Sequence, residues 1–303
     1  MPRCLFKQND YMAAIRGERG ALVMIEYFNG YYFLYIALTL GLAAGLYALL
    51  RGKSERVRTG VLFGLLLSNF ALHFLKLTLD FYRQLMPWAL TTITPENICA
   101  LNVLVFPWLF LCGKPLLRDY MFYIGVVSFG AVLWPVDVIG FGAFEAETLR
   151  YYYAHAIIAV VPLLMVLLGL HKLDYRRIVK VPLLFYLVLC IILVNEVILV
   201  GAGLVPLEWL LRYDVRNAAL IFGPLPQLEP LGALLTALTP PLFLTVPAGV
   251  GAGAVYYWPI VWLVVPFFIY FCVLALLLAL PFEHRRIRQD LLALRAKLKS
   301  LRK

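Results

Sequence analysis

Charged residues are scarce in this sequence, and that scarcity excludes most classes of soluble protein. Only 15% of the 303 residues are charged, whereas 63% are hydrophobic and the mean hydropathy is +0.86. A typical soluble domain is about 25% charged and about 45–50% apolar. A soluble chain of this size cannot bury so much apolar surface. We therefore exclude a cytosolic enzyme, a secreted module and a disordered protein, and predict that most of the chain lies in lipid.

Cysteine is also sparse, and the sequence lacks the usual cofactor motifs. Its five cysteines, at positions 4, 99, 112, 190 and 272, are odd in number and scattered, so they indicate no disulfide framework. No H-x-x-x-H or C-x-x-C spacing, phosphate-binding loop, G-x-S-x-G turn or dinucleotide-binding fingerprint is found. We expect neither a metal site nor a bound cofactor.

Long apolar runs are what the chain has in abundance. Seven of them approach or exceed the roughly 20 residues that a spanning helix needs: 31–50, 60–80, 98–113, 119–140, 151–170, 181–203 and 258–281. They predict an all-α, multi-pass membrane bundle over residues 31–282. An N-terminal segment, 1–30, precedes the bundle. Between 204 and 257 the chain is apolar and rich in Pro and Gly, which favours a lid or re-entrant segment over an eighth span.

The basic residues predict the orientation of the bundle. The loops at 51–59, 113–119 and 171–180 and the tail carry 18 Lys and Arg, against 8 on the opposite side. Because basic loops stay in the cytoplasm, we expect the N-terminus outside and the C-terminus inside the cell membrane. The first run has no small-residue cleavage site, so it is expected to act as an anchor. The net charge of +10 is thereby assigned to lipid headgroups and not to nucleic acid.

The tail, 283–303, reads as a basic amphipathic helix. Its apolar residues recur at intervals of four and three, and its other face is basic: Ile287, Leu291, Leu294, Leu298 and Leu301 form the stripe. Such a helix binds an anionic membrane surface or forms a short coiled coil.

Polar residues inside the predicted spans are the candidates for function, because ionisable groups are costly in lipid. They are His73, Lys76, Asp80, Glu96, Asn97, Asn102, Asp137, His155, Asn195 and Glu196. The predicted topology places all of them in the outer half of the bilayer, as a shared cavity requires. Two structural alternatives remain open. Lys76 and Asp80 can form a local ion pair, and His73 and Glu196 can hydrogen-bond between helices.

Cys99 has the best chemical case among these residues. Thr94, Pro95 and Glu96 resemble an N-cap followed by the first helical positions, which puts Cys99 in about the second turn. The positive end of the helix dipole there favours a thiolate. His155 begins its span at a similar depth and is a candidate general base. Cys112, Cys190 and Cys272 are expected to be packing residues.

Several stretches resemble the YwaF-like bacterial membrane proteins, which are similar to the eukaryotic transmembrane protein 164 group. The resemblance runs from about 60 to 282, most of the membrane domain, and these stretches carry it: Pro95–Cys99, Leu117–Gly125, Tyr153–His155, His171–Arg177, Arg216-Asn217, Phe222–Pro224 and Tyr257–Pro259. Asn97 departs from the pattern, since many YwaF-like sequences have a His there. The resemblance implies a lipid acyltransferase whose essential Cys and His fall on Cys99 and His155.

The favoured hypothesis is therefore an acyltransferase, or an acyl hydrolase, acting on a phospholipid or lysophospholipid. Cys99 would form a thioester, and His155 would move the protons. Asn97, Asn102 or a main-chain N–H would stabilise the oxyanion. Further expected roles are orientation of His155 by Asp137 or Glu196, and phosphate binding by Lys76 or by Arg216 with Asn217. The rival hypothesis is a transporter or sensor that uses the polar cluster as a relay.

Overall fold

The structure is a computed structural model that describes residues 23–207, 219–224, 229–245 and 256–301. Its long helices are α2 (Gly30–Leu50), α3 (Glu55–Leu75), α5 (Ile98–Cys112), α6 (Pro115–Val127), α8 (Ala146–Leu167), α9 (Val181–Gly201) and α11 (Val264–Leu301). Six helical stretches are long and apolar enough to cross a membrane, and α5 is a shorter apolar helix. The predicted all-α multi-pass architecture is confirmed, with each of the seven apolar runs forming a helix.

Short elements connect the long helices. They are η1 (Lys76–Thr78), α4 (Asp80–Arg83), η2 (Trp88–Ile93), α7 (Gly130–Leu133), η3 (Tyr175–Lys180), α10 (Glu229–Thr236), η6 (Pro241–Phe243) and η7 (Val261–Leu263). Two two-residue strands, β1 (Leu244–Thr245) and β2 (Tyr256–Tyr257), pair antiparallel. In the described part of 204–257 no helix is long enough to span a membrane.

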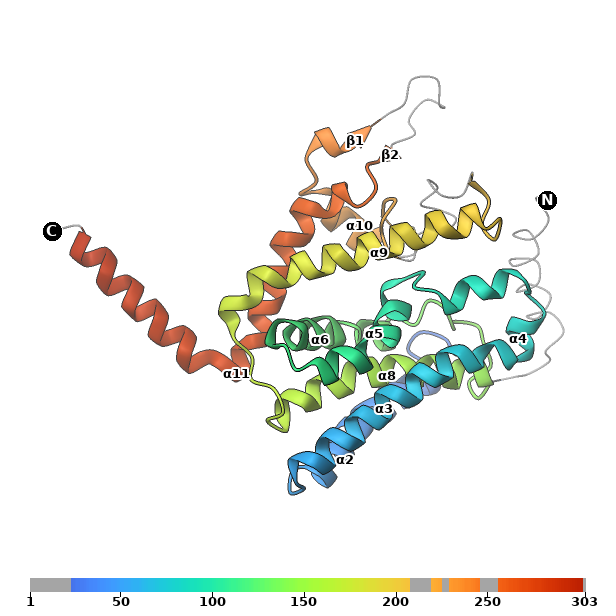
Figure 1. Cartoon of the computed structure of the whole chain (residues 1–303), viewed down its shortest axis with the longest axis horizontal. Coiled ribbons are helices and arrows are strands. Elements are labelled where there is room, and N and C mark those ends of the chain that lie inside the picture. Colours follow the sequence, from blue (N-terminus) through green and yellow to red (C-terminus); the bar gives the residue numbers. More distant parts are fainter. Residues whose placement is uncertain (1–22, 208–218, 225–228, 246–255, 302–303) are drawn as a thin grey trace.

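Helix α8 occupies the centre of the bundle (Figure 1) and packs against α2, α3, α5, α6 and α7. Its closest neighbour is α6, and Gly125 permits their approach. A Cβ atom at Gly125 would lie 2.6 Å from the main-chain oxygen of Ile158 and 2.7 Å from Cγ of Pro162. Small residues allow such backbone contact between membrane helices.

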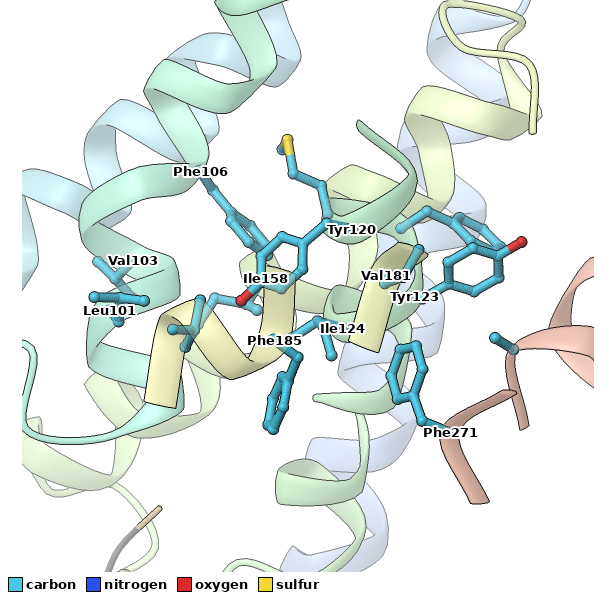
Figure 2. Close-up of a cluster of buried hydrophobic side chains, with 14 of the residues drawn as sticks. Leu101, Val103, Phe106, Tyr120, Tyr123, Ile124, Ile158, Val181, Phe185 and Phe271 are labelled. Atoms are coloured by element: carbon cyan, nitrogen blue, oxygen red, sulfur yellow. The ribbon is translucent and has the colours of Figure 1, made fainter. Parts of the chain in front are cut away.

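The main core lies where α5, α6, α8, α9 and α11 converge. Figure 2 shows Phe106 from α5, Tyr120 from α6 and Phe185 from α9 filling the space between these helices. The Tyr120 hydroxyl donates to Oδ1 of Asn102 over 2.9 Å, which links α6 to α5 inside the core. This packing fixes α5, the helix that carries Cys99, against its neighbours.

Two predicted spans end earlier than the hydropathy indicated. The fourth stops at Leu133 because Pro135 disfavours the helical conformation at Trp134, which has φ −133° and ψ 69°. Asp137 therefore lies in a loop and not in a helix. Helix α3 ends at Leu75, and Asp80 begins the short helix α4. His73, Lys76 and Asp80 therefore do not lie on one continuous helix.

The two ends of the bundle are closed by chain segments distant in sequence. At the end that carries α4, the segment before α2 pairs with the loop before α8, where Ile25 N donates to Phe141 O over 2.9 Å. At the other end, η3 packs against α11. The tail is not a separate helix but the second half of α11, which bends as it leaves the bundle (Figure 1) near Pro281.

Candidate functional site

Cys99 occupies the second position of α5, in its first turn. Asn97 is the N-cap, and its Oδ1 accepts the main-chain N–H of Ala100 over 2.8 Å. The predicted cap at Thr94 is wrong, because the Thr94 hydroxyl donates instead to the oxygen of Thr91 over 2.6 Å and closes the preceding turn. The correction brings Cys99 closer to the helix N-terminus, where the unpaired N–H groups and the dipole favour negative charge.

Three of the predicted polar residues hold the segment that leads to Cys99. Lys76 Nζ donates to the oxygen of Thr92 over 2.6 Å, and His73 Nε2 donates to the oxygen of Ile93 over 3.1 Å. Asn195 Nδ2 then donates to Oγ1 of Thr94 over 3.0 Å. Side chains from α3, the turn after it and α9 thus form hydrogen bonds to the consecutive residues 92–94 before α5. The His73 bond joins α3 to the main chain of η2.

His155 is oriented by its own helix. Its Nδ1 lies 2.8 Å from the oxygen of Tyr151, which can only accept, so Nδ1 carries the proton and Nε2 has a free lone pair. Among the described residues no carboxylate bonds this ring, so a main-chain carbonyl replaces the orienting Asp137 or Glu196 that we expected. A neutral imidazole with a free Nε2 is the form that a general base requires.

Tyr151 lies beside His155, one turn earlier in α8. Its ring centroid is 4.1 Å from that of His155, and its hydroxyl is close enough to Cys99 and Asp137 to interact electrostatically with both. Helices α5 and α8, which carry Cys99 and His155, are in contact. Within the described ranges no hydrogen bond joins Cys99 to His155. Catalytic hydrogen bonds are often long in unliganded enzymes and shorten when substrate binds.

A charged group that the sequence analysis missed adjoins this region. Glu147 accepts from Arg150 over 2.5 and 2.7 Å and from the Tyr82 hydroxyl over 2.7 Å. Burial raises the pKa of Tyr82 far above its ordinary value, so it remains a neutral donor. The i,i+3 spacing of Glu147 and Arg150 was the available signal, but it is also typical of an ordinary helix surface.

Asp137 and Asn102 complete the polar groups around Cys99. Burial raises the pKa of Asp137 above its ordinary value, and the negative charges of Glu96 and Glu147 raise it further. Asp137 also interacts electrostatically with Cys99. Asn102 is fully buried, and its Nδ2 has no hydrogen-bond partner among the described residues. Such an unused donor one turn after Cys99 is a rare feature in a folded protein.

The remaining predicted residues divide into three groups. Asp80 is 87% exposed and pairs with Arg83 over 3.8 Å, so the predicted Lys76–Asp80 pair is not formed. Glu196 is buried in α9 and is engaged with neighbouring groups. Arg216 and Asn217 lie outside the described residues.

A second polar network lies at the opposite end of the bundle, and the sequence analysis did not identify it. Asp119 is fully buried, lies 2.7 Å from His171 Nε2 and pairs with Arg177 Nε. Asp174 connects Arg177 at 3.5 Å to Arg286 at 3.3 Å on α11. These residues fix the loop after α8 to α6 and α11.

No three His, Cys, Asp or Glu side chains in the described part of the chain are grouped as a metal ion would require. The Cys99 end of the bundle carries a thiol, an imidazole and an amide donor. This combination fits nucleophilic catalysis by the general rule that a nucleophile is paired with a base.

Comparison with known proteins identifies the family. The TMEM164 family profile matches residues 26–207, more than half of the chain. The protein belongs to the TMEM164 family. No curated protein and no solved structure matches this TMEM164-family chain. The matched range includes both Cys99 and His155 and ends at the beginning of the Pro/Gly-rich region, so the family assignment covers these two residues and helices α2 to α9.

Proposed function

We propose that this TMEM164-family protein is a membrane lipid acyltransferase, or an acyl hydrolase, with Cys99 as nucleophile and His155 as base. The observation that carries the proposal is the pairing of a thiol at the N-terminus of α5 with an imidazole on the adjoining α8, whose Nε2 is free to accept a proton. The helix terminus favours the thiolate, and the imidazole supplies the base.

The reaction balances with these two residues. The Sγ atom of Cys99 attacks the acyl carbonyl carbon of a phospholipid while His155 Nε2 takes the thiol proton. The ester C–O bond breaks, the leaving oxygen receives that proton, and a thioester remains on Cys99. His155 next takes the proton of an acceptor hydroxyl, whose oxygen attacks the thioester. The C–S bond breaks, and the thiol is restored with the proton from His155. Water in place of the acceptor gives hydrolysis.

Asn102 Nδ2 supports this mechanism as an oxyanion donor. It is buried, it has no partner among the described residues, and it lies one helical turn after Cys99. Asn97 is a weaker candidate, because its side-chain oxygen is committed to the cap. Removal of one oxyanion donor typically lowers kcat by about 10²–10³.

The membrane placement belongs to the same proposal. The Cys99 site lies in the outer half of the cell membrane, with the N-terminus outside and the basic tail on the anionic inner surface. The distribution of Lys and Arg supports this orientation. The exposed apolar stripe of the tail, which includes Leu291, Leu294 and Leu298, supports contact with lipid.

A transporter or sensor is the second candidate, and it would use His73 and Lys76 as a relay. These side chains bond main-chain oxygens of Ile93 and Thr92, so they are engaged in holding the segment before Cys99. We therefore rank this candidate below the acyltransferase.

The test is intact-protein mass spectrometry after incubation of the purified protein with phospholipid. We expect a hydroxylamine-labile acyl adduct on Cys99 that disappears when a lysophospholipid is added. Cys99→Ala should form no adduct, whereas Cys190→Ala, which removes an exposed thiol on α9, should behave as wild type. An adduct that forms equally in Cys99→Ala would overturn the proposal.

A further inference from the structure

A groove separate from the Cys99 site runs between α3 and the start of α8. Its volume is about 400 Å³, within the range of small-molecule sites. The walls are mostly apolar and include Leu72, Leu75, Leu149 and Tyr153. Two cations, Lys76 and Arg150, also line it. An apolar groove with cations belongs to a class of site that binds an amphipathic anion.

The groove lies on the opposite side of α8 from His155. The residues of α8 that line it are spaced by three, one and three positions and so form one stripe along the helix: Ala146, Leu149, Arg150 and Tyr153. His155 follows Tyr153 by two residues, so it faces roughly 200° away. The groove is therefore not part of the catalytic centre proposed above.

Among the described residues, Arg150 is the one of these two cations that has a carboxylate within ion-pair distance. Arg150 is neutralised by Glu147 at 2.5 Å. Lys76 is 94% buried, yet its Nζ bonds only the oxygen of Thr92, and no carboxylate of the described chain pairs with it. The Tyr82 ring lies 5.5 Å from Lys76 Nζ and 5.8 Å from Arg150 Cζ, so both cations flank the same side chain. A buried charge without a counter-ion is costly, and it favours an incoming anion.

The arrangement along the groove matches the shape of a lipid. Lys76 directly follows α3 and Arg150 lies near the start of α8, so both cations are at the same end of the bundle. Leu72 and Tyr153 lie about one turn further into the bundle. Ser68 bonds the Tyr153 hydroxyl over 2.6 Å, and Asn69 donates to Ala154 O over 3.2 Å, so α3 and α8 are joined by hydrogen bonds next to this part of the groove. Leu75 and Leu149 are exposed, so the side of the groove is open to lipid.

We propose that this groove binds a membrane phospholipid, with its phosphodiester on Lys76 and Arg150 and one acyl chain along the apolar wall. The single negative charge of a phosphodiester balances the single unpaired cation. The site does not depend on the proposed catalysis, because it needs neither Cys99 nor His155.

The test is native mass spectrometry of the full-length Cys99→Ala protein, in which acyl transfer cannot consume the probe. The probes are dioleoyl phosphatidylglycerol and dioleoylglycerol, which differ by the phosphate-containing headgroup. We expect the phospholipid to bind at least about tenfold more tightly, since a charge-assisted contact is worth more than about 1.4 kcal/mol. Adding Lys76→Met should abolish this preference. Adding Lys53→Met, which removes an exposed lysine beyond the other end of α3, should preserve it.

A second variant guards against misfolding of the first. Leu149→Trp, at a position 47% exposed, should fill the groove and lower phospholipid binding with little change in Tm. The proposal would be overturned if the Cys99→Ala protein, which retains Lys76, bound the two probes equally. It would also be overturned if the folded protein with Lys76→Met still preferred the phospholipid. Unchanged phospholipid binding by folded Leu149→Trp would do the same.

Discussion

The Nδ1 atom of His155 donates to the main-chain oxygen of Tyr151 over 2.8 Å, one helical turn earlier in α8. In the neutral imidazole this bond places the proton on Nδ1 and leaves Nε2 as the acceptor, and it requires no carboxylate. The orientation of the proposed base is thus encoded in the helix itself, and it persists as long as α8 is folded. It differs from a catalytic triad, where a buried acid orients the histidine.

The first prediction concerns this base. His155→Ala should lower the rate of acyl-adduct formation on Cys99 by about 10²–10⁴, the usual contribution of a positioned general base. Rates are measured by mass spectrometry at fixed lipid concentration. His284→Ala removes an exposed histidine from the tail and should react as wild type. A full rate in His155→Ala would remove His155 from the mechanism.

The second prediction concerns the cap of α5. Asn97→Ala leaves the N–H of Ala100 without its acceptor and should destabilise the protein by about 1 kcal/mol. Asn97→Asp keeps an acceptor at the same position and should retain most of the stability. Thermal unfolding in detergent compares the two variants. If both behave alike, the Asn97 side chain does not determine the start of α5.

The third prediction concerns the contact between α6 and α8. Gly125→Ala places a Cβ atom 2.6 Å from Ile158 O, so it should destabilise by about 1–3 kcal/mol through overpacking. Gly130→Ala is the matched control, because nothing lies within 4 Å of its Cβ position. That control should be neutral or raise Tm slightly, as Ala favours a helix over Gly. Equal Tm values for the two variants would contradict the close approach at Gly125.

The fourth prediction compares a buried and an exposed carboxylate at the end of the bundle that carries the second polar network. Asp119→Asn leaves Arg177 and His171 without their shared carboxylate and should cost about 3–5 kcal/mol, because Asp119 is fully buried. Asp290→Asn breaks its pair with Arg176, at 2.7 Å, where both side chains are partly exposed. That loss should leave Tm nearly unchanged.

A second measurement distinguishes the two carboxylates further. Limited trypsin digestion should cut the tail of Asp290→Asn faster than that of wild type, since the tail is released from Tyr175 and Arg176. A large drop in Tm for Asp290→Asn, or a small one for Asp119→Asn, would contradict this division of roles.

The apolar helices, six of them long enough to span a membrane and α5 shorter, could be predicted because hydropathy depends only on local composition. Helix ends were less predictable, because they depend on single contacts. Asn97 and not Thr94 caps α5, because the Thr94 hydroxyl is bonded to Thr91. Pro135 ends the preceding helix, so Asp137 lies in a loop. These are choices between neighbouring residues that a hydropathy pattern does not resolve.

The supporting contacts of the site were the least predictable part. Lys76, His73 and Asn195 were identified as polar residues of the membrane, but their shared target, residues 92–94, appears only when α3 and α9 are placed beside α5. Asp119 and His171 were missed for the same reason, since 52 residues separate them in the chain. A local sequence pattern cannot report pairs of that kind.

The continuity of α11 has a mechanical consequence. One helix runs from Val264 in the bundle to Leu301 at the tip of the basic tail, without a loop between them. At about 1.5 Å per residue, the part beyond Pro281 extends roughly 30 Å from the bundle. Pairs from Arg286 to Asp174 and from Asp290 to Arg176 clamp its base. The tail is therefore joined to the last span without a flexible linker, and its direction relative to the bundle is set by the helix and by these two ion pairs.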